Sequence, residues 1–295
     1  MPIADHLLAH PTLFIIIAGL LGATIGSFLN VVIHRLPLMM EQQWRHQCET
    51  LEAEANGTPP PPPPAKTFNL AIPSSHCPHC SHNIRPSENI PILSYLMLRG
   101  KCSQCANAIA VRYPIVEGVT GLLSATVAWH FGFGWEGVTA LALTWALVPL
   151  TVIDLDHQLL PDTITLPFLW VGLALSLTGT FTDPASALIG AMAGYLSLWS
   201  LYWAFKLLTG KEGMGYGDFK LLAMLGAWLG WQMLPVVIFL SAIVGSVVGI
   251  TLIALKRHQQ GTPIPFGPYL AGAGWIALLW GEDISDGYLR FSGLM

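Results

Sequence analysis

The chain has 295 residues, of which 53% are hydrophobic and only 10% are charged, and its formal net charge is −4. Soluble domains carry about 25% charged residues, so this composition excludes an ordinary soluble enzyme and indicates a membrane protein. The sequence also lacks the basic stripe of a nucleic-acid-binding protein, and we expect no nucleic-acid partner.

Eight apolar segments follow one another along the chain, each bounded by charged residues or turn signals. A membrane-spanning helix needs about 20 apolar residues. We therefore expect an all-α polytopic membrane protein in contact with lipid, with about eight transmembrane helices at residues 12–33, 113–131, 136–153, 162–180, 186–208, 219–233, 234–255 and 264–281. No Lys or Arg precedes Arg35, so we expect the first span to stay as an anchor rather than to be removed as a signal peptide.

The basic residues indicate which side of the membrane each loop occupies, because Lys and Arg concentrate in cytoplasmic loops. With the start of the chain outside, the inside segments are residues 34–112, 154–161, 209–218 and 256–263. Of the thirteen Lys and Arg residues, only Arg290 lies outside these segments and the helix ends beside them. This threading predicts a multi-pass protein with Asp154 and Asp218 on the same, cytoplasmic face.

The long inside segment between the first and second spans contains two CxxC pairs, Cys77 with Cys80 and Cys102 with Cys105, separated by twenty-one residues. Four thiolates in this spacing are typical of a closed, structural zinc site. The alternatives are two disulfides or a redox motif. Stable disulfides are rare in the cytoplasm, and a redox CxxC is expected singly in a soluble α/β setting. The fifth cysteine, Cys48, is interpreted as an incidental thiol, and His79 and His82 as solvated.

Three acids follow the third span. Asp154 comes directly after Val152 and Ile153, so it is expected nearest the apolar interior, and spacing favours it over Asp156 as a functional acid. Asp162 stands at the start of the fourth span, where helix capping is the simplest role.

A fourth acid, Asp218, follows Gly215-Tyr216-Gly217 at the mouth of the sixth apolar segment. An acid in that place is costly in hydrocarbon and usually functional, and the glycines allow a tight turn and close approach of another chain. The glycine spacing is not that of a dinucleotide-binding loop. Lys220 either pairs with Asp218 or marks the inner face.

We predict that the loops around Asp154 and Asp218 meet in one site. When two carboxylates lie a few ångströms apart, one keeps a proton. The charged group can then take a proton from water while the neutral group protonates a carbonyl oxygen or a leaving amine. This is aspartyl protease chemistry. The alternatives are a proton-coupled transporter with the same acids as a relay, and a non-enzymatic zinc-bearing scaffold.

Three other features admit two interpretations each. Asn30, at the inner end of the first span, is read as a packing group in preference to a substrate contact. Glu117, near the start of the second span, favours the helix dipole or has a functional role. Residues 261–269, which contain three prolines, either line a cavity near the aspartates or simply punctuate a helix start.

Residues 215–218 form the GxGD motif of the intramembrane aspartyl proteases. Together with residues 153–162, the paired CxxC motifs and residues 26–30, they make the chain resemble the type IV prepilin peptidases, the leader peptidases and N-methyltransferases of bacterial pilus and type II secretion systems. The resemblance covers nearly the whole chain, and the motifs occur in the order found in the family. The proline run at 59–64 looks like a variable insertion.

The resemblance implies a bacterial inner-membrane enzyme that cleaves basic leaders from type IV prepilins and pseudopilins and then methylates the new N-terminus with S-adenosylmethionine. It implies Asp154 and Asp218 as the catalytic pair, and Cys77, Cys80, Cys102 and Cys105 as zinc ligands. The binding residues for S-adenosylmethionine are not implied by any motif. We expect three parts: a first transmembrane helix at 1–33, a cytoplasmic zinc-binding segment with a Pro-rich linker at 34–112, and a seven-helix membrane aspartyl protease domain at 113–295.

Overall fold

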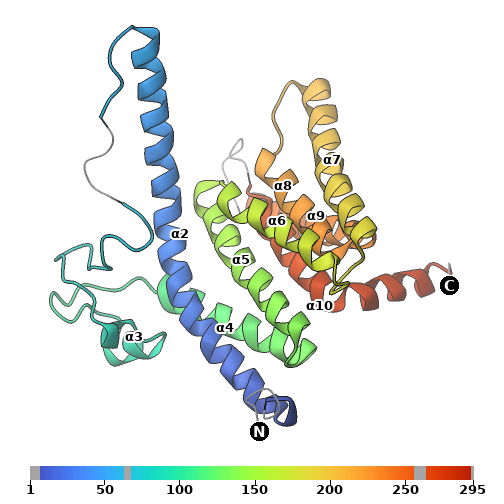
Figure 1. Ribbon diagram of the computed structural model, residues 1–295, viewed down its shortest axis with the longest axis horizontal. Coiled ribbons are helices and arrows are strands. Elements are labelled where there is room, and N and C mark those ends of the chain that lie inside the picture. Colours follow the sequence, from blue (N-terminus) through green and yellow to red (C-terminus); the bar gives the residue numbers. More distant parts are fainter. Residues whose placement is uncertain (1–6, 63–67, 256–263, 294–295) are drawn as a thin grey trace. The chain divides into compact units, whose positions relative to one another are not determined.

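The structure is a computed structural model that describes residues 7–62, 68–255 and 264–293 (Figure 1). Part of the Pro-rich linker, with Lys66, and the loop 256–263, with two further basic residues, lie outside the described residues. The chain divides into two compact units: an N-terminal unit of residues 10–126 and a C-terminal unit that holds residues 127–295. The predicted domain limits after residues 33 and 112 refer to membrane crossings, which this division does not test, and they remain predictions.

The N-terminal unit begins with α2, a single helix of 45 residues from Pro11 to Ala55. At 1.5 Å per residue it is about 67 Å long, whereas the hydrocarbon core of a bilayer is about 30 Å thick. The expected first span forms its first half, and the polar residues that follow continue the same helix past Pro37. A short 3₁₀ turn (Pro86–Asn89) and α3 (Leu93–Met97) follow in the segment between α2 and α4.

Helix α4 (Arg112–Phe131) belongs to the N-terminal unit up to residue 126, and this part packs closely against α2. A Cβ placed on Gly26 would lie 2.8 Å from the Cα of Glu117, and one on Gly22 would collide with Ser124. At the end of this contact, the Asn30 side-chain amide donates a hydrogen bond to the carbonyl oxygen of Tyr113, 3.1 Å away. Asn30 therefore makes the interhelical bond that the packing interpretation requires.

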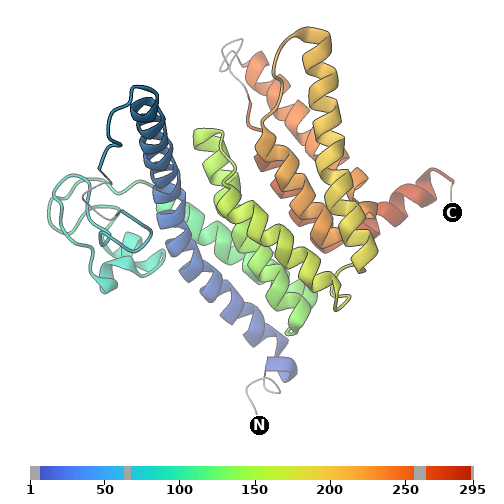
Figure 2. The ribbon, with the colours of Figure 1, turned by 45° about the horizontal axis from the view of Figure 1, so that its top comes forward.

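The C-terminal unit is a helical bundle (Figures 1 and 2). Its elements are α5 (Trp135–His157), α6 (Asp162–Ser176), α7 (Pro184–Thr209), α8 (Tyr216–Leu229), a 3₁₀ turn (Trp231–Met233), α9 (Leu234–Ala254) and α10 (Gly267–Phe291). Helix α10 bends at Trp280, whose backbone is not helical, and the bend is visible in Figure 2. It falls where the eighth predicted span ends.

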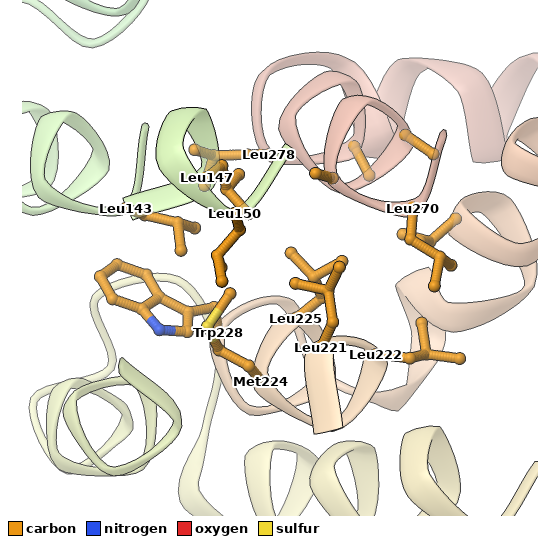
Figure 3. Packing of buried hydrophobic residues seen from close by; sticks show 14 of the residues in the cluster. Leu143, Leu147, Leu150, Leu221, Leu222, Met224, Leu225, Trp228, Leu270 and Leu278 are labelled. Carbon is orange, nitrogen blue, oxygen red and sulfur yellow. The ribbon is translucent and has the colours of Figure 1, made fainter. Parts of the chain in front are cut away.

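Helix α8 is the core of this bundle. It has only 14 residues, and ten of them, Asp218 to Trp228 apart from Lys220, are buried. Its leucines join leucines of α5 and α10 in one apolar cluster. In Figure 3, Leu221 and Leu225 lie on the side of Leu150, and Leu278 lies next to Leu147. At about 21 Å, α8 is shorter than a hydrocarbon core is thick, and protein surrounds most of it.

Small residues let α7 and α8 approach each other. Gly190 and Gly226 face one another so closely that a Cβ on either would collide with the backbone of the other helix. We expect Gly226→Ala to lower the free energy of unfolding by about 1–3 kcal/mol, because the backbone cannot rotate aside as a side chain can. Gly272→Ala on α10 is the matched control, since a Cβ there meets nothing within 4 Å. It should be neutral or gain up to about 1 kcal/mol in helix propensity, as thermal unfolding in detergent would measure.

The all-α prediction is confirmed for the described residues, which contain helices and two isolated β-bridges but no strand. Each of the eight predicted spans overlaps one α-helix, but the sixth, at 219–233, runs past the end of α8 at Leu229 and includes the 3₁₀ turn Trp231–Met233. By length and apolar composition, four helical stretches of the described chain can cross a membrane: Pro11–Ala55, Trp135–His157, Pro184–Thr209 and Trp231–Ala254. The protein therefore has the helices of a membrane protein, while the total of eight crossings remains a prediction.

Candidate active site and metal site

Asp154 lies in the last turn of α5. The helix ends at His157, and the C-cap residue Gln158 adopts the left-handed conformation (φ 55°) and donates its backbone N–H to the carbonyl oxygen of Asp154, 2.9 Å away. The Asp154 side chain points into the protein and is only 5% exposed, whereas Asp156 is exposed. Asp154 is therefore the more buried of the two acids, as their positions in the sequence indicated.

Asp218 lies in the first turn of α8, three residues after the N-cap Gly215. It is 6% exposed, and its Oδ1 atom is buried with no hydrogen-bond partner among the described residues. A carboxylate in a helix first turn is favoured by the helix dipole. A buried polar atom without a partner is nevertheless costly, and such an atom is expected where a reacting molecule is to bind.

The two acids lie on helix ends that come together. Between the helix ends lies Leu160, whose side chain would be 2.8 Å from a Cβ on Gly217 and 3.2 Å from a Cβ on Gly267. The end of α5, the start of α8 and the start of α10 therefore surround one small region. The prediction that the loops around Asp154 and Asp218 come together agrees with this arrangement.

The start of α10 contributes a residue that the sequence did not single out. The backbone N–H of Gly267 donates a hydrogen bond to Asp154 Oδ2, 3.0 Å away. The sequence left open whether residues 261–269 line the site or only punctuate a helix. For the described residues from 264 onward, this hydrogen bond favours the first interpretation.

Lys220 binds a different acid from the one considered in the sequence. Its Nζ lies 2.8 Å and 2.6 Å from the two carboxylate oxygens of Asp162, so the pair joins the first turns of α8 and α6. The N-cap residue of α6 is Pro161, with no side-chain cap hydrogen bond. The helix-cap interpretation of Asp162 is therefore wrong, because its carboxylate binds Lys220 instead.

The Lys220–Asp162 pair is expected to make a small contribution to stability. Its side chains are 30% and 50% exposed, and solvent screens such pairs to about 1 kcal/mol or less. A double-mutant cycle of Lys220→Met and Asp162→Asn, read by unfolding in detergent, should give a coupling of about 0.5 kcal/mol. A coupling of zero would mean that the contact does not hold α6 to α8.

The four cysteines of the CxxC pairs form one cluster in the N-terminal unit. All four Sγ atoms lie within 4.8 Å of one another, with 3.8 Å between those of Cys77 and Cys105 and 3.9 Å between those of Cys80 and Cys102. A tetrahedral zinc ion with Zn–S bonds of about 2.3 Å places its sulfurs about 3.8 Å apart. The donor set and its spacing therefore fit zinc, and none of the four is in a disulfide.

Each CxxC pair is a tight knuckle of the same form. In the first, the Cys77 N–H donates to His82 O and the Ser81 N–H to Cys77 O. In the second, Cys102 N–H donates to Asn107 O and Ala106 N–H to Cys102 O. Ser81 and Ala106 both have positive φ angles, 58° and 55°. These backbone turns bring the two cysteines of each pair close together. Cys48, on α2, is exposed and outside the cluster.

Glu88 links the two knuckles. Hydrogen bonds from the Ser103 side chain and the Arg85 backbone N–H, together with the contact to His82, lower the pKa of Glu88 to about 2. His82 Nε2 lies 3.1 Å from Glu88 Oε2, so the expectation that His82 is merely solvated is wrong. His79 is exposed, as expected.

Comparison with known protein families gives one match in each unit. Residues 20–131, which include the cysteine cluster, match the bacterial Peptidase A24 N-terminal domain, and residues 141–250, which include both buried acids, match the type IV leader peptidase family. No solved structure matches the chain.

Several relatives are similar over their whole length, and each bears the name prepilin leader peptidase/N-methyltransferase. The protein of Pseudomonas aeruginosa is 58% identical over 99% of both chains. That of Stutzerimonas stutzeri is 56% identical over 98% of this chain and 99% of its own. That of Xanthomonas campestris is 49% identical over 97% of this chain and 98% of its own. This chain belongs to the type IV leader peptidase family.

Proposed function

We propose that the protein cleaves the leader peptide from type IV prepilins and pseudopilins and then methylates the new N-terminus. The observation that carries the peptidase half is the pair of buried acids, Asp154 and Asp218, at the junction of three helix ends. A pair of interacting carboxylates away from bulk solvent is the arrangement in which one acid stays charged and the other neutral. The names of the relatives support the choice of substrate and of reaction.

The mechanism needs no covalent intermediate. The charged carboxylate takes a proton from a water molecule, and the water oxygen bonds to the carbonyl carbon of the scissile peptide. The neutral acid gives its proton to the carbonyl oxygen. When the tetrahedral intermediate collapses, the C–N bond breaks and the leaving nitrogen takes a proton from the site. The products are a leader ending in a carboxylate and a mature chain with a free amine.

The predicted topology explains why the cut falls at the inner membrane boundary. A basic leader stays in the cytoplasm, where Lys and Arg are retained, while the apolar helix that follows it lies in the bilayer. The scissile bond must then lie between the two. Asp154 lies at the end of α5 and Asp218 at the start of α8. Acids at helix ends, rather than at helix centres, suit a cut at the membrane boundary.

Methyl transfer would use S-adenosylmethionine, which supplies a methyl group on a positively charged sulfur. Rossmann-type methyltransferases bind S-adenosylmethionine at a strand–loop–helix site. The described residues contain no strand, so they contain no site of this kind. The methyl-transfer half is supported by the names of the relatives alone.

Zinc would be held by Cys77, Cys80, Cys102 and Cys105. Four protein ligands leave no open position for water, so the ion would hold the two knuckles together rather than take part in hydrolysis. Ser103 and Glu88 support the same role, because their hydrogen bond joins the knuckles beside the cluster.

One experiment tests both halves. Purified full-length protein is incubated with a synthetic prepilin and a labelled methyl donor, and leader cleavage and methyl incorporation are measured separately in each aspartate and cysteine variant. We expect cleavage to precede methylation and to depend on both acids. Proton-driven uptake of a solute into proteoliposomes, with no cleavage of prepilin, would instead favour a transporter.

A further inference from the structure

The two acids of the pair have different surroundings. Asp154 Oδ2 accepts a hydrogen bond from the Gly267 backbone N–H at 3.0 Å, and the contact is buried. Asp218 Oδ1 is equally buried but has no hydrogen-bond partner among the described residues. Two chemically identical groups are therefore held in two unlike environments, which is the condition under which acids divide the work of catalysis.

The donor comes from the first turn of α10. The first backbone N–H groups of a helix have no partner within the helix, and they carry the positive end of its dipole. The next residue of α10, Pro268, has no N–H. The N–H of Tyr269 donates a hydrogen bond to the carbonyl oxygen of Phe266, 3.1 Å away. The Gly267 N–H is thus the first-turn donor that reaches the acid pair.

Only glycine leaves room for this contact. A Cβ on residue 267 would lie 2.6 Å from Asp154 Oδ2 and 3.1 Å from its Cγ, and it would also press on Leu160 Cδ1 at 3.2 Å. These distances are shorter than carbon can approach without displacement of its neighbours. Any side chain at this position would therefore push the carboxylate away from the amide.

A hydrogen bond from N–H to a carboxylate favours the charged form, whereas a buried carboxylate oxygen without a donor favours the neutral form. The Asp218 carboxyl group receives a hydrogen bond from the Gly215 backbone of its own helix start, but its Oδ1 atom has no partner among the described residues. The other groups around the pair do not reverse this order. Lys220 is bound to Asp162. Asp156 and His157, at the end of α5, are exposed. The phenol of Tyr269 on α10 is uncharged at neutral pH.

We propose that Gly267 is a positioning residue that holds Asp154 as the charged member of the pair, so that Asp154 activates the water and Asp218 carries the proton. This inference rests on the proposed peptidase function. Asp154 takes a proton from water as the C–O bond forms, and Asp218 gives its proton to the carbonyl oxygen. On collapse, Asp154 passes its proton to the leaving nitrogen as the C–N bond breaks, and Asp218 recovers a proton from the hydroxyl, which restores both starting states.

The first test compares Gly267→Ala with Gly272→Ala on the same helix, where a Cβ meets nothing within 4 Å. Cleavage of a synthetic prepilin is followed as a function of pH. Loss of a charge-assisted hydrogen bond predicts a fall in kcat of about tenfold or more in Gly267→Ala, with KM unchanged and with the acid limb of the profile moved to higher pH. Gly272→Ala should match the wild type. An acid limb that stays in place in Gly267→Ala would overturn the proposal.

A second measurement does not depend on activity, and it keeps the test valid if Gly267→Ala folds poorly. Infrared difference spectra report a protonated buried carboxyl group by its C=O stretch. We expect this band in the wild type and in Asp154→Asn, and its loss in Asp218→Asn. A band that survives in Asp218→Asn and vanishes in Asp154→Asn would reverse the assignment and overturn the inference.

The two proposals can fail separately. If Asp154→Asn and Asp218→Asn both cleave prepilin at the wild-type rate, the peptidase assignment itself is wrong. If both variants are inactive but Gly267→Ala behaves as Gly272→Ala does, the acid pair stands and only the role of Gly267 is refuted.

Discussion

Asp154→Asn and Asp218→Asn should each reduce prepilin cleavage by about 10³-fold or more. Each acid supplies proton transfer that is worth about 10² to 10⁴ in rate, and residues that act as a unit lose most of their effect when either is removed. Asn has nearly the volume of Asp, and at position 154 its carbonyl oxygen can still accept the Gly267 N–H. The measurement is the initial rate of leader release by purified protein in detergent.

Asp156→Asn is the matched control for this prediction. It removes one negative charge two residues from Asp154, but from a side chain that is exposed rather than buried. We expect it to retain cleavage within about fivefold of the wild type, far above the loss expected for a general acid or base. Zinc content and unfolding temperature should be unchanged in all three variants. If Asp156→Asn were inactive and Asp154→Asn active, the catalytic role would move to Asp156.

Cys102→Ser should release the metal and unfold the segment from residue 77 to residue 105. We expect near one equivalent of zinc per chain in the wild type, because four Sγ atoms within 4.8 Å of one another offer one tetrahedral site. In small metal-binding segments the apparent binding free energy of roughly 10–16 kcal/mol is also folding free energy. Metal analysis and hydrogen exchange over this segment are the measurements.

Cys48→Ser is the control, since Cys48 is a free, exposed thiol on α2. It should keep its zinc and its exchange protection. Absence of metal from freshly purified wild-type protein would remove the zinc assignment. Equal loss in Cys48→Ser and Cys102→Ser would show that the cluster is not the binding site.

The positions of the helices could be read from the sequence because the signals are local. Hydropathy and turn residues placed the second span at 113–131, and α4 runs from Arg112 to Phe131. The same approach ended the first helix too early, at residue 33. The residues after the first span are mostly good helix formers, including Glu, Gln and Leu, and they extend α2 to Ala55. Their polarity identifies a segment outside hydrocarbon, but it does not end a helix.

The contacts of single side chains could not be read in the same way. Lys220 is two residues from Asp218 in the chain, yet it binds Asp162, 58 residues away. His82 lies beside the cysteines, yet it contacts Glu88. In both cases the partner is not the nearest candidate in the sequence, because the packing of the folded chain decides which group each side chain reaches.

The sequence by itself determined the helical class, the cysteine cluster and the two acids, because hydropathy, CxxC spacing and an acid behind glycines are each properties of a short stretch of chain. Only the tertiary structure decided that the short α8 lies at the centre of its bundle and that the Gly267 amide faces Asp154. Burial and hydrogen bonding depend on what surrounds a residue, and the first residue of α10 reaches Asp154, 113 positions earlier in the chain, only when the bundle is assembled.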